Sequence, residues 1–214
     1  MTTSDTPGAE SGTTRFEAFS DGVFAIAITL LVLEIRLPAE HQIEALGGLG
    51  RALLGLWPSY AGYVISFLTI GIMWANHHSV VKLMARSDHG LIVWNLLLLM
   101  AISFTPFTTA VMADYLHHPG WDRTIAVAFY CGSFTLTALF YNALWRHASH
   151  GRSLLHPHVS DARVRAITRA YWPGTFLYGL ATAAAFVSVP AALAIVSGLA
   201  LFYILPRSGA HASS

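Results

Sequence analysis

Long apolar runs, each close to the length of a membrane-spanning helix, constrain this chain more than any other feature. A span needs about 20 mostly apolar residues. Six stretches come near that length, at roughly 16–36, 53–75, 90–113, 122–146, 170–188 and 191–206. One helix over 170–206 would be about 55 Å long, which exceeds a bilayer, so we expect a tight hairpin broken at Pro190. The sequence predicts an all-α integral membrane protein with six transmembrane helices.

The composition agrees with a membrane protein and excludes several other classes. Only 11% of the 214 residues are charged and 55% are hydrophobic, whereas soluble domains carry about a quarter of charged residues. The net charge of +1 argues against a nucleic-acid partner, and the single cysteine, Cys131, cannot form a disulfide within one chain. Residues 1–14 hold no Lys or Arg, so we expect a short disordered tail rather than a signal peptide.

The distribution of basic residues predicts the orientation in the membrane. If the N-terminus is cytoplasmic, nine Lys and Arg lie inside and three outside, as the positive-inside rule requires. The inside set is Arg15, Lys82, Arg86, Arg146, Arg152, Arg163, Arg165, Arg169 and Arg207, and the outside set is Arg36, Arg51 and Arg123. Both termini are therefore predicted to be cytoplasmic. A membrane domain over 15–206 is expected between the tails at 1–14 and 207–214.

The first span is unusual because it carries polar residues near both ends. Its strictly apolar part, from Val23 to Leu33 with Thr29 inside it, covers only about 16 Å of a hydrocarbon core of roughly 30 Å. Ser20, Asp21 and Glu34 are therefore expected at or near membrane depth, where ionisable residues mark functional sites or internal pairs. Structural pairing and direct ion contact both remain open for Asp21, and Glu34 with Arg36 also fits an interfacial position.

A helical wheel separates the faces of this first span. One stripe consists of small residues, namely Ala18, Gly22, Ala25 and Thr29. Beside it lies a stripe of larger apolar residues, namely Phe19, Ile26, Leu30 and Leu33. Asp21 points about 140° away from Ile26, so we expect it to face a neighbouring helix of the same subunit. Periodicity alone favours lipid contact for the face that holds Ile26.

The second span ends in polar residues that could partner Asp21. Trp74, His77 and His78 can each donate a hydrogen bond to a carboxylate. Adjacent histidines on a helix are 100° apart, which disfavours a shared metal. The His-rich loops near 114–122 and 147–158 lack a recognised ligand spacing. No GxxxxGK[ST], GxSxG, HExxH, CxxC or TVGYG motif occurs, so we expect no enzyme, no cofactor and no metal site.

The opening RFEAFSD, joined to GVFAIAITLLVLEI, resembles the R-x-x-x-F-S-D signature of the lysosomal potassium channel family. Arg15, Phe19, Ser20 and Asp21 carry the match, and Trp74 and His77 resemble a second family pattern, W-x-x-H. The layout resembles that of a bacterial member with a single six-helix repeat. This resemblance implies a homotetramer in the bacterial plasma membrane, with the first helix of each subunit lining a central pore and potassium as the permeant ion.

The resemblance also implies roles for individual residues. Ile26, Leu30 and Leu33 would form the constriction rings of a leak-like, potassium-selective channel, with Thr29 offering a hydroxyl. Arg15, Phe19, Ser20, Asp21, Trp74 and His77 would belong to the structural network that holds the first helix. The alternative is a proton-coupled or small-solute transporter that uses Asp21 and His77 as a relay. Transporters usually show internal repeats and helices broken at midplane, and the opening stretch occurs once.

Overall fold

The computed structural model describes residues 7–204, which form helices joined by short connections. The long helices are α1 (Pro7–Leu33), α4 (Trp57–Val81), α5 (His89–Ser103), α6 (Thr105–Tyr115), α7 (Trp121–Ser149), α8 (Asp161–Ala185) and α9 (Val189–Ile204). The short ones are α2 (Glu40–Ala45), α3 (Leu49–Gly55) and the 3-10 turn η1 (His150–Arg152). Over the described residues the predicted all-α class is confirmed.

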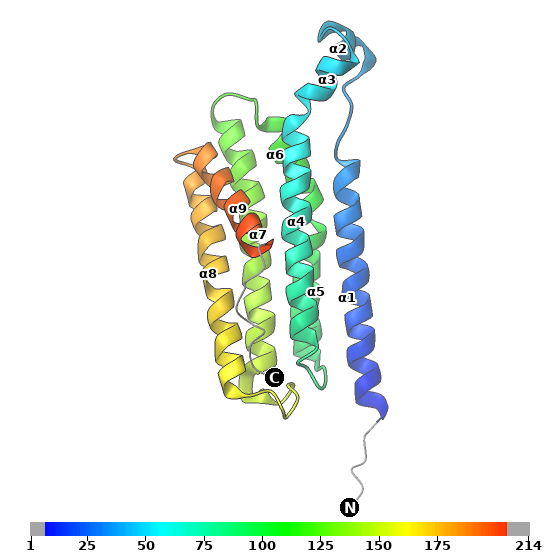
Figure 1. Cartoon of the computed structure of the whole chain (residues 1–214), viewed down its shortest axis with the longest axis vertical. Helices are drawn as coiled ribbons and strands as arrows, with labels where there is room; N and C mark the ends of the chain where they lie inside the picture. The colour runs from blue at the N-terminus through cyan, green and yellow to red at the C-terminus, as the bar shows by residue number, and fades with distance from the viewer. Residues whose placement is uncertain (1–6, 205–214) are drawn as a thin grey trace, which may run out of the picture.

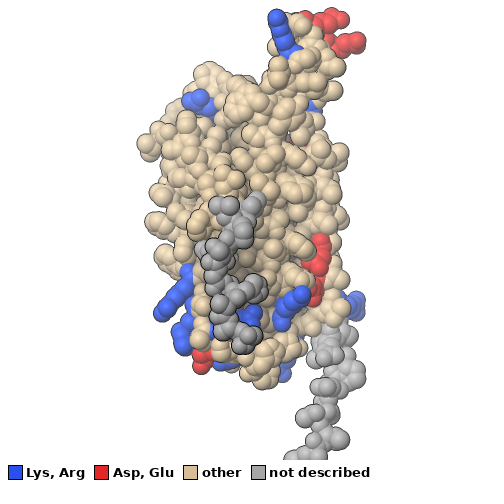
Figure 2. Space-filling model, viewed as in Figure 1, with Lys and Arg blue, Asp and Glu red and all other residues tan. Residues whose placement is uncertain are grey.

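The helices form a bundle in which α1 lies at one edge. α1 contacts α4, α5 and α6, whereas α8 packs against α7 and α9 on the other side of the molecule (Figure 1). The helices α2 and α3 stand beyond the end of the bundle. Charged side chains on the visible surface gather toward its ends, with an uncharged belt between them (Figure 2). Such a belt suits the hydrocarbon layer of a bilayer.

Four helical stretches are long and apolar enough to cross a membrane by length and composition. They are Thr13–Leu33, Trp57–Val81, His89–Tyr115 and Trp121–Arg152. These match the first four predicted spans and support the membrane class. The fifth and sixth predictions correspond to α8 and to α9, which is apolar but shorter.

The third span is interrupted near its middle, as its proline predicts. α5 ends at Ser103 and α6 begins at Thr105, with Pro106 in the first turn of α6. Proline has no N–H to donate, so the helical ladder loses a hydrogen bond there. Threonine hydroxyls supply others: Thr105 donates to the carbonyl of Ala101 at 3.5 Å, and Thr109 donates to that of Thr105 at 2.8 Å.

The C-terminal hairpin forms where it was expected, although the break precedes the proline. α8 ends at Ala185 and α9 starts at Val189, so Pro190 lies in the first turn of α9. Proline suits that position because its missing N–H would have no partner there.

The connection between the fourth and fifth helices is shorter than the predicted spans at 122–146 and 170–188 imply, because α7 runs to Ser149 and α8 begins at Asp161. Ser160 caps α8 by accepting a hydrogen bond from the backbone nitrogen of Arg163 at 3.2 Å. The remaining loop is tied to the α4–α5 connection by two backbone hydrogen bonds, Ala85 to Leu154 and His156 to Leu83.

The first helix is longer than the sequence predicted. α1 begins at Pro7, inside the stretch 1–14 that was expected to be a disordered tail. The expected tail at 207–214 lies outside the described residues.

Candidate ion pathway and its supports

The helix α1 has one face packed into the subunit and one face left open. Phe24, Ala27 and Leu31 are each only 1% exposed because they face the core formed with α4, α5 and α7. Ile26, Leu30 and Leu33 point the other way, with 60%, 40% and 66% of their surfaces exposed. A single subunit therefore presents one apolar stripe of α1 that its own fold does not cover.

Polar groups lie beside this stripe and at its C-terminal end. The hydroxyl of Thr29 donates to the carbonyl oxygen of Ile26 at 2.9 Å. Its proton is therefore committed to the backbone, whereas its oxygen lone pairs stay available. Near the end of the helix, Arg36 lies 3.1 Å from the carboxylate of Glu34 in an exposed ion pair. That pair reduces the negative charge that Glu34 would offer to a cation.

On the N-terminal side of the stripe, a buried chain of hydrogen bonds joins α1, α4 and α5. Ser20 of α1 is fully buried and accepts a hydrogen bond from the side-chain amide of Asn95 on α5 at 2.9 Å. The carbonyl oxygen of the same amide lies 2.9 Å from Nε2 of His77 on α4, which is also fully buried. The ring of Phe24 packs on His77 with centroids 5.4 Å apart. This chain fixes α1 against both of its neighbours.

A second contact between α1 and α4 lies closer to the surface. The indole nitrogen of Trp74 donates to Oδ1 of Asp21 at 2.8 Å. Asp21 thus faces a helix of its own subunit, and Trp74, rather than either histidine, is its hydrogen-bond donor. The other two residues of the expected network behave differently. Arg15 and Phe19 are exposed, and Arg15 forms no ion pair with any residue in the described part of the chain.

Glu17 and His78 add a pairing that the sequence analysis did not anticipate. Oε1 of Glu17 lies 2.8 Å from Nδ1 of His78, a close contact that lacks hydrogen-bond geometry. Ligand atoms of Glu17, Asp21 and His78 all lie within 4.8 Å of one another, the one such group of three among the described residues. Two carboxylates and an imidazole are a donor set that could hold a divalent cation, whereas no metal site was expected from the sequence.

Asn95 and Glu17 are the members of these contacts that sequence reasoning missed. Asn95 was visible as an amide inside an apolar span, which is a signal for an internal hydrogen bond. Glu17 carries a fainter signal, because it lies one helical turn before Asp21 and therefore on the same side of α1.

The comparisons with known proteins identify the family. The family model described as the endosomal/lysosomal potassium channel TMEM175 matches residues 15–106. A potassium channel of Chamaesiphon minutus is 47% identical over 201 residues, which cover 94% of this chain and 97% of the relative. The chain belongs to the TMEM175 family. The resemblance inferred from the sequence is thereby confirmed.

A solved member of the TMEM175 family has the same fold. The crystal structure of a lysosomal potassium-selective channel TMEM175 homologue from Chamaesiphon minutus matches with a TM-score of 0.82 at 46% identity, covering 92% of this chain and 98% of that one. The similarity extends to animals. The endosomal/lysosomal proton channel TMEM175 of Gallus gallus is 32% identical over 149 residues, which cover 67% of this chain but 30% of the relative.

Proposed function

We propose that this protein is a potassium channel of the bacterial cell membrane, not an enzyme, and that α1 lines its ion pathway. The observation that carries the proposal is the open apolar stripe of α1, which is held rigidly from behind by the Ser20–Asn95–His77 chain. The Chamaesiphon minutus relative that matches nearly the whole chain bears the name of a potassium channel, and the homologue solved from the same organism that of a potassium-selective channel. Potassium is the permeant ligand in this proposal, which involves no cofactor.

The pore requires several copies of the chain. One subunit contributes one stripe, so a closed ring of stripes needs rotational symmetry, and we propose a homotetramer. Ile26 would then form the narrowest ring, with Leu30 and Leu33 extending the dry segment and Thr29 presenting an oxygen beside them. Apolar constrictions gate by dewetting, because slight widening admits water and with it a hydrated ion.

The membrane topology is part of the same proposal. We place six spans in the domain 15–206, counting α5 with α6 as one and α8 and α9 as the fifth and sixth. Both termini would be cytoplasmic, together with the 207–214 tail. The positive-inside asymmetry of nine basic residues against three supports this orientation.

The hydrogen bonds of Asp21 and His77 favour a structural network over a proton relay. A relay between Asp21 and His77 would need the two groups to exchange a proton directly or through a short chain. His77 instead bonds to the amide of Asn95, and Asp21 bonds to Trp74. An amide cannot pass a proton on readily, so Ser20, Asp21, Trp74 and His77 fit the role of braces for α1. Arg15 and Phe19 are exposed, and we propose that they contact a neighbouring subunit.

Ion-specific flux into liposomes tests the proposal. Purified protein is reconstituted with internal potassium, and efflux is followed against gradients of potassium, sodium or protons. A potassium flux that does not saturate and does not depend on a pH gradient supports the channel. A flux driven only by protons, as the name of the Gallus gallus relative would suggest, would contradict potassium as the permeant ion, and saturable flux would indicate a carrier.

A further inference from the structure

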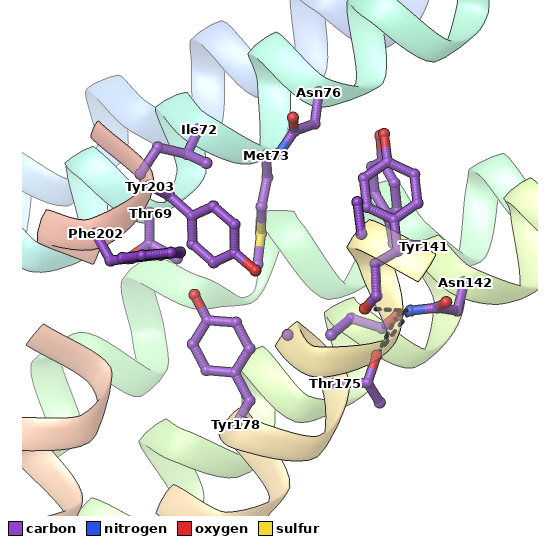
Figure 3. Close-up of a pocket in the computed structure, with 14 residues that line it drawn as sticks. Thr69, Ile72, Met73, Asn76, Tyr141, Asn142, Thr175, Tyr178, Phe202 and Tyr203 are labelled. Atoms are coloured by element: carbon purple, nitrogen blue, oxygen red, sulfur yellow. Dashed lines mark hydrogen bonds between the residues drawn. The ribbon is translucent and has the colours of Figure 1, made fainter. Parts of the chain in front are cut away.

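A cavity lies on the side of α4 that faces away from α1. It has a volume of about 380 Å³, within the usual range for small-molecule sites, and is lined by residues of α4, α7, α8 and α9 (Figure 3). None of the described residues that line it comes from α1. The cavity is therefore separate from the proposed ion pathway.

Four helices form the walls of the cavity. α4 contributes Thr69, Ile72, Met73 and Asn76, and most of the other lining residues belong to α7 and α8. The last turn of α9, with Phe202 and Tyr203, forms one wall of the cavity.

The chemistry of the walls selects an uncharged ligand. None of the described lining residues carries a charge, and an unpaired charge buried there would be strongly unfavourable. Hydrogen-bonding groups are nevertheless present. The side chains of Asn76 and Tyr203 line the cavity (Figure 3), and neither forms a side-chain hydrogen bond within residues 7–204. Asn76 is half-buried, and its amide can donate to and accept from a bound hydroxyl or amide group.

Other polar groups of the wall are already paired and give the cavity a fixed shape. The side-chain nitrogen of Asn142 donates to the hydroxyl of Thr175 at 2.7 Å and to the carbonyl of Ala138 at 3.0 Å. The Tyr141 hydroxyl lies 3.4 Å from that of Tyr171. These bonds tie α7 to α8, and a preformed wall of this kind lowers the entropic cost of binding.

We infer that this cavity binds an uncharged amphiphile taken from the bilayer, with an apolar body and a hydroxyl head that bonds to Asn76. The inference goes beyond ion conduction and does not depend on it. α4 connects the two sites, since Met73 and Asn76 line the cavity while Trp74 and His77 contact α1 and α5. An occupant that shifts α4 would therefore alter the support of α1.

Photolabelling of the purified full chain in lipid nanodiscs tests the inference. The probe is hexadecanol carrying a diazirine, and the labelled residues are mapped by mass spectrometry. We expect saturable labelling at Met73 and Tyr178 that excess unlabelled hexadecanol removes. Labelling that does not saturate, or equal labelling by the diazirine-bearing carboxylate, hexadecanoate, would overturn the inference.

Two variants locate the site, with a matched control. A Cβ placed on Gly174 would lie 3.6 Å from the Tyr203 hydroxyl, so Gly174→Leu directs its side chain into the cavity and should abolish saturable labelling. Gly198→Leu, on α9, makes the same change where a Cβ meets nothing within 4 Å, and labelling should persist. Asn76→Leu removes the bond to the head group and should weaken binding about fivefold. Unchanged labelling in monodisperse Gly174→Leu would contradict the assignment.

Discussion

Asn95 donates its side-chain amide to the hydroxyl of Ser20 across the α1–α5 contact, at a nitrogen-to-oxygen distance of 2.9 Å. The hydroxyl in turn donates to the carbonyl of Phe16 at 2.9 Å. Because the amide oxygen of Asn95 also contacts His77, one side chain satisfies buried groups on two other helices. The orientation of the exposed α1 stripe therefore depends on a residue of α5.

Replacing Asn95 with leucine should destabilise the subunit strongly. The change keeps the approximate volume but removes the donor to the Ser20 hydroxyl, which keeps its bond to Phe16, and the partner of Nε2 of His77. Each lost bond to a buried polar group costs about 1–3 kcal/mol. Thermal unfolding in detergent measures the loss. Asn76→Leu is the matched control, because Asn76 forms no side-chain hydrogen bond within the described residues and its replacement should change stability little. Similar losses in both variants would contradict the bracing role of Asn95.

The contact between Trp74 and Asp21 should contribute less, because it is only partly buried. Trp74→Phe keeps an aromatic ring beside His78, with which Trp74 stacks at a centroid distance of 5.9 Å, and removes only the indole donor. We expect a loss of about 1–2 kcal/mol and a lower yield of assembled oligomer. A double-mutant cycle with Asp21→Ala isolates the pair. Additive effects in that cycle would mean that the two residues do not stabilise each other.

Substitution at the proposed constriction should change conduction without changing the fold of the subunit. Ile26→Asn places a polar side chain where 60% of the isoleucine is exposed, so it should favour wetting of the pore and raise the potassium flux or reduce its selectivity. Liposome flux with potassium and sodium measures both effects.

Val32→Asn is the matched control for the constriction. Val32 is 50% exposed on the same helix but points about 120° away from Ile26. Its flux should match that of the wild type. Equal effects of the two substitutions would indicate that the exposed face of α1 contacts lipid rather than an ion path.

Much of the architecture was predictable because membrane helices depend on local apolar length. The four long spans, the break near Pro106 and the α8–α9 hairpin all follow from runs of apolar residues and from proline. The separation of the α1 faces was equally predictable, since Asp21 and Ile26 differ by a fixed angle on any helix.

Contacts between distant residues were harder to predict, because periodicity says which face a residue occupies but not which partner it meets. The sequence suggested His77 or His78 as donors to Asp21 as readily as Trp74, and only the packing of α1 on α4 selects the indole. The helical start of α8 at Asp161 was also missed, since its basic first turns hide the helix from a search for apolar runs.

The α5 N-terminus provides a pH-dependent prediction outside the membrane. Asp88 caps α5 by accepting a hydrogen bond from the backbone nitrogen of Leu91 at 2.7 Å, and it contacts Nε2 of His147 at 2.9 Å. The Leu91 N–H and then the imidazole of His147 lower the pKa of this carboxyl in the folded protein. Because folding lowers the pKa, the ionised carboxyl stabilises the folded protein at pH values above its ordinary pKa, which is near 4. This contribution disappears as the pH falls through the lowered pKa.

Thermal unfolding of three proteins between pH 7 and pH 3 checks this behaviour. Asp88→Ala should cost about 1 kcal/mol at neutral pH because the cap is lost. Asp88→Asn keeps a capping oxygen but no charge, so its deficit against the wild type should be small at neutral pH and should vanish in acid. Gly90→Ala is an independent check, because a Cβ there would collide with the His147 ring and displace it from Asp88. A deficit of Asp88→Asn that grows as pH falls would contradict the lowered pKa.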